Sequence, residues 1–272
     1  MTRQYSIKNF LRRMPKPFLG RYFEEKNLFS ELNFLDMDEG SPENLFLAWE
    51  ALPDEKRQIL DVEFRQIFNM SCKKGTILIT DTAKFYLPEP DRTIFVEKLA
   101  SLRNAYECAM LTFLDWPQLW QQAQRVQYVD NLSTHWHLRM NFPHQAPAID
   151  GDSLRQLSDA IRQYFHTTEG RGNNCFVEYF RRGNLDCFLA YPEDHSAYGL
   201  DWSNNKLNTR PHNPPFEIVF MYSKKQGSLN LNFEGSNKVV EALQSMFAKT
   251  ILKIDMALLK NEWVKGFSAV KN

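Results

Sequence analysis

The chain has 272 residues, zero net charge, 43% hydrophobic residues and 21 phenylalanines. This apolar content is enough for one large domain or two modest ones, and the balanced charge argues against a protein whose whole surface binds a polyanion. No apolar run reaches the roughly 18 residues of a membrane-spanning helix, and the basic N-terminus lacks the apolar core of a secretory signal. We therefore expect a cytoplasmic protein that does not contact a membrane.

Basic and acidic residues are unevenly distributed over the first 63 residues. Residues 1–23 carry six lysines or arginines and no acid, whereas residues 24–63 carry twelve acids against three basic residues. Arg12 and Arg13 end a short amphipathic pattern in the basic segment. This segment could bind nucleic-acid phosphates, lie on an anionic membrane or pack on the acidic segment. The third interpretation is favoured because the opposite charge is adjacent in sequence.

Residues 1–140 are predicted to be mostly helical, because apolar residues recur at intervals of three and four along most of this region. One long helix is expected from about residue 93 to 113. The stretch 71–90 reads as irregular, with a short strand at 76–80. A segment with two prolines and a glycine, 140–151, is the predicted boundary.

The second region, 152–272, is predicted to contain a helix, two β-hairpins and a helix. The hairpin strands, which alternate apolar and polar residues, are expected at 175–180, 185–191, 216–222 and 228–234. Residues 198–202 could add a fifth strand. The predicted fold class is therefore α+β, with a helical N-terminal half followed by an antiparallel sheet of four or five strands flanked by helices. The two regions could also form one continuous domain.

Carboxylates on the predicted strands are the first candidate for chemistry. Glu178, Asp186 and Glu217, with Lys224 and Lys225 nearby, could be assembled into metal-dependent phosphodiester chemistry. Their spacing matches no nuclease motif, and solvated or ion-paired acids are the favoured interpretation. We identify no catalytic residue and predict no cofactor.

Basic residues near the first hairpin are a second candidate site. Arg171 lies in a Glu-Gly-Arg-Gly segment between a helix and a strand, where backbone N–H groups could face an anion. The favoured interpretation is a tight turn with Gly170 at the helix C-terminus. Arg181 and Arg182, in the hairpin turn, would add to a small basic patch.

Histidines and cysteines provide the remaining candidates. His135, His137 and His144 could reach a metal ion, since two histidines two apart share one face of a strand. Surface histidines at a helix end are favoured, so no metal site is predicted. The four cysteines show no motif spacing and are expected to be reduced core thiols.

Several aromatic residues of the second region could form a platform for nucleic-acid bases or a peptide. They are Tyr179, Tyr191, Tyr198, Trp202 and Tyr222. At strand spacing, such residues more often pack in the core or across strands.

Two short segments carry a family resemblance. They are Glu-Gly-Arg-Gly-x-x-Cys-x-Val-Glu at 169–178 and Arg-Pro-x-x-Pro-x-Phe-Glu at 210–217. With the helical N-terminal half, they resemble uncharacterised bacterial proteins from mobile-element or phage-defence gene neighbourhoods. The resemblance implies a bacterial cytosolic protein with an accessory role, and it carries over no catalytic residue.

The absence of a catalytic signature and the charge asymmetry of residues 1–63 favour a non-enzymatic interaction protein. Such a protein would be an adaptor, sensor or accessory subunit of a larger complex, with a protein partner or a second copy of itself. The alternative is a nucleic-acid-binding or metal-dependent nucleic-acid-processing protein.

Overall fold

The structure is a computed structural model that describes residues 4–34, 36–37, 43–132, 134–203, 206–256 and 263–264. The chain divides into two compact units, Met1–Tyr128 and Val129–Asn272. The division precedes the segment 140–151 because β1 (Trp136–Arg139) already belongs to the sheet of the second unit.

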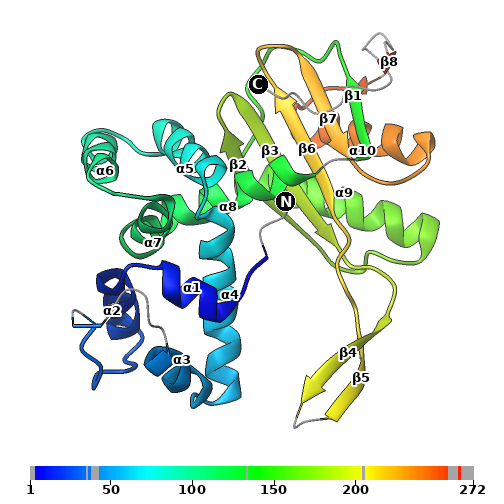
Figure 1. Ribbon diagram of the computed structural model, residues 1–272. Coiled ribbons are helices and arrows are strands. Elements are labelled where there is room, and N and C mark those ends of the chain that lie inside the picture. The colour runs from blue at the N-terminus through cyan, green and yellow to red at the C-terminus, as the bar shows by residue number, and fades with distance from the viewer. Residues whose placement is uncertain are drawn as a thin grey trace. The chain divides into compact units, whose positions relative to one another are not determined.

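The first unit is helical (Figure 1). Its helices are α1 (Ile7–Arg13), α2 (Lys16–Glu25), α3 (Glu43–Glu50), α4 (Asp54–Met70), α5 (Lys73–Tyr86), α6 (Asp91–Ala100), α7 (Ala105–Asp115) and most of α8 (Pro117–Asn131). None of the helices in the described part of the chain is long and apolar enough to cross a membrane.

Phe64 of α4 lies at the centre of an aromatic cluster in this first unit. Its ring centroid is 4.6 Å from that of Phe10, 4.8 Å from that of Tyr22 and 5.4 Å from that of Trp49. These four side chains come from four different helices. Because such aromatic pairs add to the stabilisation from burial, the cluster ties α1, α2, α3 and α4 into one core.

The sequence prediction was wrong for residues 71–90, most of which form α5. The helix begins where the Cys72 Sγ accepts the Gly75 N–H at 3.4 Å. A Cβ on Gly75 would collide with the Met70 carbonyl group. Cysteine is an unusual N-cap, so the start of the helix carries no recognisable signal.

The helix expected from about 93 to 113 is also two helices, α6 and α7. Asn104 interrupts it, because its side-chain oxygen accepts the N–H groups of Tyr106 and Glu107 and so caps α7. A side chain that caps a new helix competes with continuation of the preceding one.

The second unit contains an antiparallel sheet with the strand order β2-β3-β6-β7-β1-β8. Its further strands are β2 (Cys175–Arg182), β3 (Leu185–Pro192), β6 (Ile218–Ser223), β7 (Ser228–Asn232) and the two-residue β8 (Trp263–Val264). The predicted α+β class, with a helical N-terminal half followed by an antiparallel sheet, is confirmed. Both predicted hairpins form, with Gly183 and Gly227 at positive φ in their turns.

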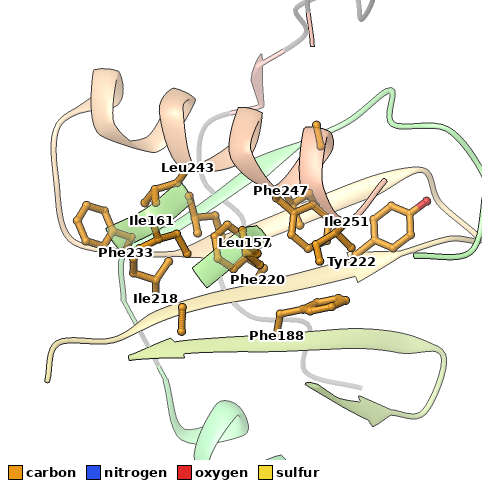
Figure 2. Close-up of a cluster of buried hydrophobic side chains, with 14 of the residues drawn as sticks. Leu157, Ile161, Phe188, Ile218, Phe220, Tyr222, Phe233, Leu243, Phe247 and Ile251 are labelled. Atoms are coloured by element: carbon orange, nitrogen blue, oxygen red, sulfur yellow. The ribbon is translucent and has the colours of Figure 1, made fainter. Parts of the chain in front are cut away.

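Helices α9 (Gly151–Glu169) and α10 (Asn237–Thr250) cover the same face of this sheet. Figure 2 shows their apolar side chains packed onto those of β3 and β6. Phe247 of α10 is completely buried, with its ring 5.2 Å from those of both Phe188 and Phe220. The amphipathic stripe that the sequence shows on each helix therefore faces the sheet.

Residues 198–202 do not join the main sheet. They belong to β4 (Ala197–Ser203), which pairs only with β5 (Lys206–His212) among the described strands. We call this two-stranded ribbon the arm; it extends away from the main sheet in Figure 1. The additional strand of the main sheet is instead β1, whose core-facing residues include the polar Arg139. Because a core-facing residue is polar, β1 lacks the alternation of apolar residues by which a strand is predicted from a sequence.

Candidate functional site

The Glu-Gly-Arg-Gly segment ends α9 at the base of the arm. Gly170 has φ of 69°, and its N–H bonds to the carbonyl groups of Phe165 and His166. This left-handed residue is the helix C-cap that the sequence indicated, because glycine adopts that conformation without a steric penalty. The turn places Arg171 beside the segment that leads from β3 into the arm.

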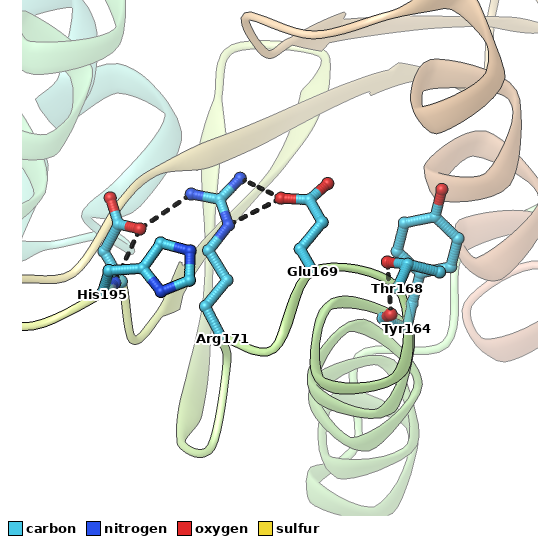
Figure 3. Close-up of polar contacts among 6 residues, drawn as sticks. Tyr164, Thr168, Glu169, Arg171 and His195 are labelled. Carbon is cyan, nitrogen blue, oxygen red and sulfur yellow. Dashed lines mark hydrogen bonds and ion pairs between the residues drawn. The ribbon is translucent and has the colours of Figure 1, made fainter.

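Arg171 contacts two carboxylates, and Figure 3 shows the bonds of its guanidinium to that of Glu169. It also contacts two aromatic rings. Its Nη1 lies 2.9 Å from Asp194 Oδ1, and its Nη2 lies 2.7 Å from Glu169 Oε2. The guanidinium lies over the Phe216 ring, 4.0 Å from the centroid, and 5.1 Å from that of Phe165. Such a planar cation can bond to carboxylates at its edge while stacking on a ring.

Asp194 shows the electrostatic consequence of this arrangement. Burial alone would raise the pKa of its carboxyl group, but the hydrogen bonds from Arg171 and the His195 N–H, with the charge of Arg171, hold that pKa below its ordinary value. The Asp194 carboxyl group is therefore ionised at neutral pH. Arg171 is compensated inside the protein rather than offered to an external anion.

Further hydrogen bonds join the residues at both ends of the arm to each other and to the rest of the second unit. Glu193 accepts the Asn174 side-chain amide at 2.6 Å and that of Asn213 at 2.5 Å. On the backbone, the Asp194 N–H donates to the Pro214 carbonyl at 2.7 Å. The segments 169–178 and 210–217 meet here, since Arg171 of the first stacks on Phe216 of the second.

The arm itself has one apolar and one polar face. Tyr198, Leu200 and Trp202 alternate along β4 and so share a face, opposite Pro211, Thr209 and Leu207 of β5. Their exposed fractions are large: 77% for Tyr198, 72% for Leu200, 68% for Trp202 and 53% for Leu207. The charged residues Asp201, Lys206 and Arg210 lie on the opposite face. The chain thus exposes a continuous apolar strip that carries no charge.

The sheet does not bring the candidate carboxylates together. Asp186 pairs in register with Arg181 and Tyr222, on the face that the helices cover, whereas Glu178 pairs with Leu189 on the opposite face. Each accepts a tyrosine hydroxyl: Tyr179 donates to Asp186 at 2.7 Å, and Tyr191 donates to Glu178 at 2.9 Å. Two acids on opposite faces cannot bind one metal ion.

The other candidate residues near the sheet are also dispersed. Arg181 Nε lies 3.6 Å from Asp186, and Arg182 Nε lies 2.5 Å from Asp130 of α8. Glu217 precedes β6, where partial desolvation raises the pKa of its carboxyl group. The arginines of the hairpin thus pair with acids of their own unit.

At the N-terminus, Arg12 and Arg13 are exposed at the end of α1. Of the other basic residues in this segment, Lys8 pairs with the acidic segment, with its Nζ 3.7 Å from Glu43, whereas Arg21 pairs with Asp115 of α7. Part of the charge asymmetry is thus satisfied within the first unit.

The histidines do not form a metal centre in the described residues, where no group of three or more histidine, cysteine or acidic side chains is placed to bind a cation. His137 Nε2 lies 3.1 Å from the Phe233 carbonyl oxygen, and His135 Nε2 lies 3.8 Å from Glu234. His144 lies against Gly227 in the turn of the second hairpin.

All four cysteines are free thiols. Burial raises the pKa of Cys175 to about 11 and that of Cys187 to about 12. Both thiols are therefore protonated at neutral pH, and their reactivity as nucleophiles is low.

This burial predicts a loss of stability at alkaline pH. The folded protein keeps the Cys175 and Cys187 protons above the unfolded pKa of about 8.5, so it binds more protons than the unfolded chain and its free energy of unfolding falls as pH rises. We expect urea denaturation to show a smaller decrease between pH 7 and about 10 in the double variant Cys175→Ala, Cys187→Ala than in the native chain. Equal pH dependence in both would contradict the assignment.

No protein-family model and no curated protein matches the chain. The candidate site therefore rests on its geometry. Sequence reasoning identified Tyr198 and Trp202 as aromatics of a sheet surface but did not separate them from Tyr179 and Tyr222, which pack against the core. The available signal was Pro192 before residues 197–212 and the pair Pro214 and Pro215 after them, since these prolines separate the arm from the strands of the sheet.

Proposed function

We propose that this protein is a non-enzymatic interaction protein, an adaptor, sensor or accessory subunit of a larger complex, and that it docks through the apolar face of the arm. The observation that carries the proposal is the exposure of Tyr198, Leu200 and Trp202 on a single uncharged face. Exposed contiguous apolar surface of this kind marks interaction sites in soluble proteins.

The residue types on the arm suit an anchor for a protein partner. Tryptophan and tyrosine dominate the energetics of protein interfaces, and full burial of a large apolar side chain contributes about 1.5–3 kcal/mol. The ion pair of Arg171 with Asp194 and the hydrogen bonds that Glu193 accepts fix the position of the base of the arm. A partner therefore loses less binding energy to ordering the arm than it would with a free loop.

Nucleic-acid binding, the alternative class, receives less support from the described residues. Arg171, Arg181 and Arg182 each pair with a carboxylate, so their charges are already compensated. Base-stacking platforms combine aromatic rings with nearby cations, whereas the apolar face of the arm carries none. The separation of Glu178 from Asp186 likewise gives no support to a nuclease.

A cytoplasmic location belongs to the same proposal, and its support is the four free thiols. Membership of a bacterial antiviral defence complex is proposed from the resemblance of the segments at 169–178 and 210–217 alone.

The docking surface can be tested by photo-crosslinking in cells of the native host. We expect Trp202→p-benzoylphenylalanine to form a covalent protein adduct under ultraviolet light, because this side chain lies on the apolar face. The matched control is Asn208→p-benzoylphenylalanine, which places the same group on the polar face of the arm. The adduct should disappear when Leu200→Ser is added to the Trp202 variant.

Absence of an adduct from position 202, or equal adducts from positions 202 and 208, would contradict the proposal. A gel-shift assay with DNA and RNA at two salt concentrations addresses the alternative class. Binding at low salt that is lost on replacing Arg210 would favour nucleic acid as the partner of the arm.

A further inference from the structure

We propose that the apolar face of the arm binds the same face of a second copy of this chain. The inference rests on the proposed function and names the occupant of the same surface. It follows from the shape, the charge and the area of the arm.

The apolar face is complementary to itself under a two-fold axis. When this axis lies between the two faces, parallel to the line from Leu200 to Thr209, the two arms run in opposite directions and the contact is self-complementary. Tyr198 and Pro211 at the base of one arm then face Trp202 and Leu207 near the tip of the other. Each large tip side chain is matched by a base residue, and the shorter Leu200 and Thr209 lie at the centre.

The positions of the charged residues on the arm favour this face-to-face arrangement. No charged side chain lies on the apolar face, so joining two copies there buries no charge, and Asp201, Lys206 and Arg210 remain in solvent. Pairing two arms edge to edge through β5 is less favourable, since an axis through Asn208 would place Lys206 of one copy opposite Arg210 of the other.

The apolar area that the two arms can bury determines the expected stability of the dimer. With their exposed fractions, Tyr198, Leu200, Trp202 and Leu207 offer on the order of 500 Å² of apolar surface per copy, or ~1,000 Å² for two copies. This lies at the lower limit of specific interfaces. The dimer should therefore form reversibly at micromolar protein concentration. A two-stranded ribbon is also marginally stable alone in water, so covering its apolar face stabilises the arm.

Sedimentation velocity on the full chain between ~1 and ~200 µM tests the inference. We expect the native chain to pass from monomer to dimer across this range. Leu200→Lys should raise the dissociation constant at least tenfold, since the axis brings the two new charges together. Asn208→Lys, on the polar face, should leave the dissociation constant unchanged. A native chain that stays monomeric at ~200 µM, or equal behaviour of the two variants, would overturn the inference.

Cross-linking separates failure of this inference from failure of the proposed function. A short bismaleimide should join two Leu200→Cys chains into a covalent dimer and should leave Asn208→Cys chains monomeric, with Cys72 and Cys175 present in both. If Leu200→Cys gives no dimer while the photo-crosslinker at position 202 captures a different protein, self-association is excluded and docking through the arm stands. If neither reagent yields an adduct, both proposals fall.

Discussion

Replacing Arg171 by alanine is expected to lower the free energy of unfolding of the second unit by about 2–3 kcal/mol. The substitution leaves Glu169 and Asp194 without their shared cation and removes the guanidinium from the Phe216 ring. The expected loss is smaller than for a fully buried pair, because both carboxylate side chains are one-third exposed. Urea denaturation followed by near-ultraviolet circular dichroism measures it.

Two variants distinguish the parts of this interaction. Arg171→Lys keeps the charge but loses the planar fork, and Arg171→Met keeps apolar bulk without the charge, so both should lie between the native chain and the alanine variant. The low pKa of Asp194 makes its contribution present above the unfolded pKa of about 3.9 and lost as pH falls through the folded value. The difference between native and variant should therefore shrink in acid, and a constant difference would contradict the ion-pair account.

The same substitution should loosen the arm without unfolding the sheet. Hydrogen exchange at the amides of β4 and β5 is expected to accelerate in Arg171→Ala, while the amides of β6, which are paired on both sides, change less. Equal acceleration in all strands would show that Arg171 supports the whole unit rather than the base of the arm.

Phe247→Ala is expected to destabilise the second unit by about 3–5 kcal/mol. The Phe247 ring is completely buried and contacts Phe188, Phe220 and Tyr222, so its removal leaves a cavity between α10 and the sheet. Its stack on Phe220, with planes 19° apart, is lost as well. Urea denaturation of the full chain gives the magnitude, and hydrogen exchange in α10 and β6 locates it.

Phe176→Ala provides a matched control for this prediction. The Phe176 side chain is 64% exposed at the edge strand β2, so its truncation should cost less than about 1 kcal/mol. A loss below about 1 kcal/mol for Phe247→Ala would contradict the close packing of α10 on the sheet.

Some features of the candidate site could be predicted from the sequence, and others could not. Arg171 and Gly170 could be predicted as a turn at a helix end, because glycine and its neighbours determine that conformation locally. The pairing of Arg171 with Asp194 and its stacking on Phe216 could not be predicted, since these residues lie far along the chain. The opposite orientation of Glu178 and Asp186 became visible only with the register of β2 on β3.

The α+β class, both hairpins of the sheet and the apolar faces of α9 and α10 could be predicted from residue patterns, because periods of 2 and 3.6 depend on near neighbours. Those patterns do not tell which of the alternating apolar strands are buried in the fold. Phe220 and Tyr222 alternate on β6 as Leu200 and Trp202 do on β4, yet α9 and α10 cover the first pair and leave the second in solvent. Burial depends on contacts between distant segments, and the pattern within one strand does not record them.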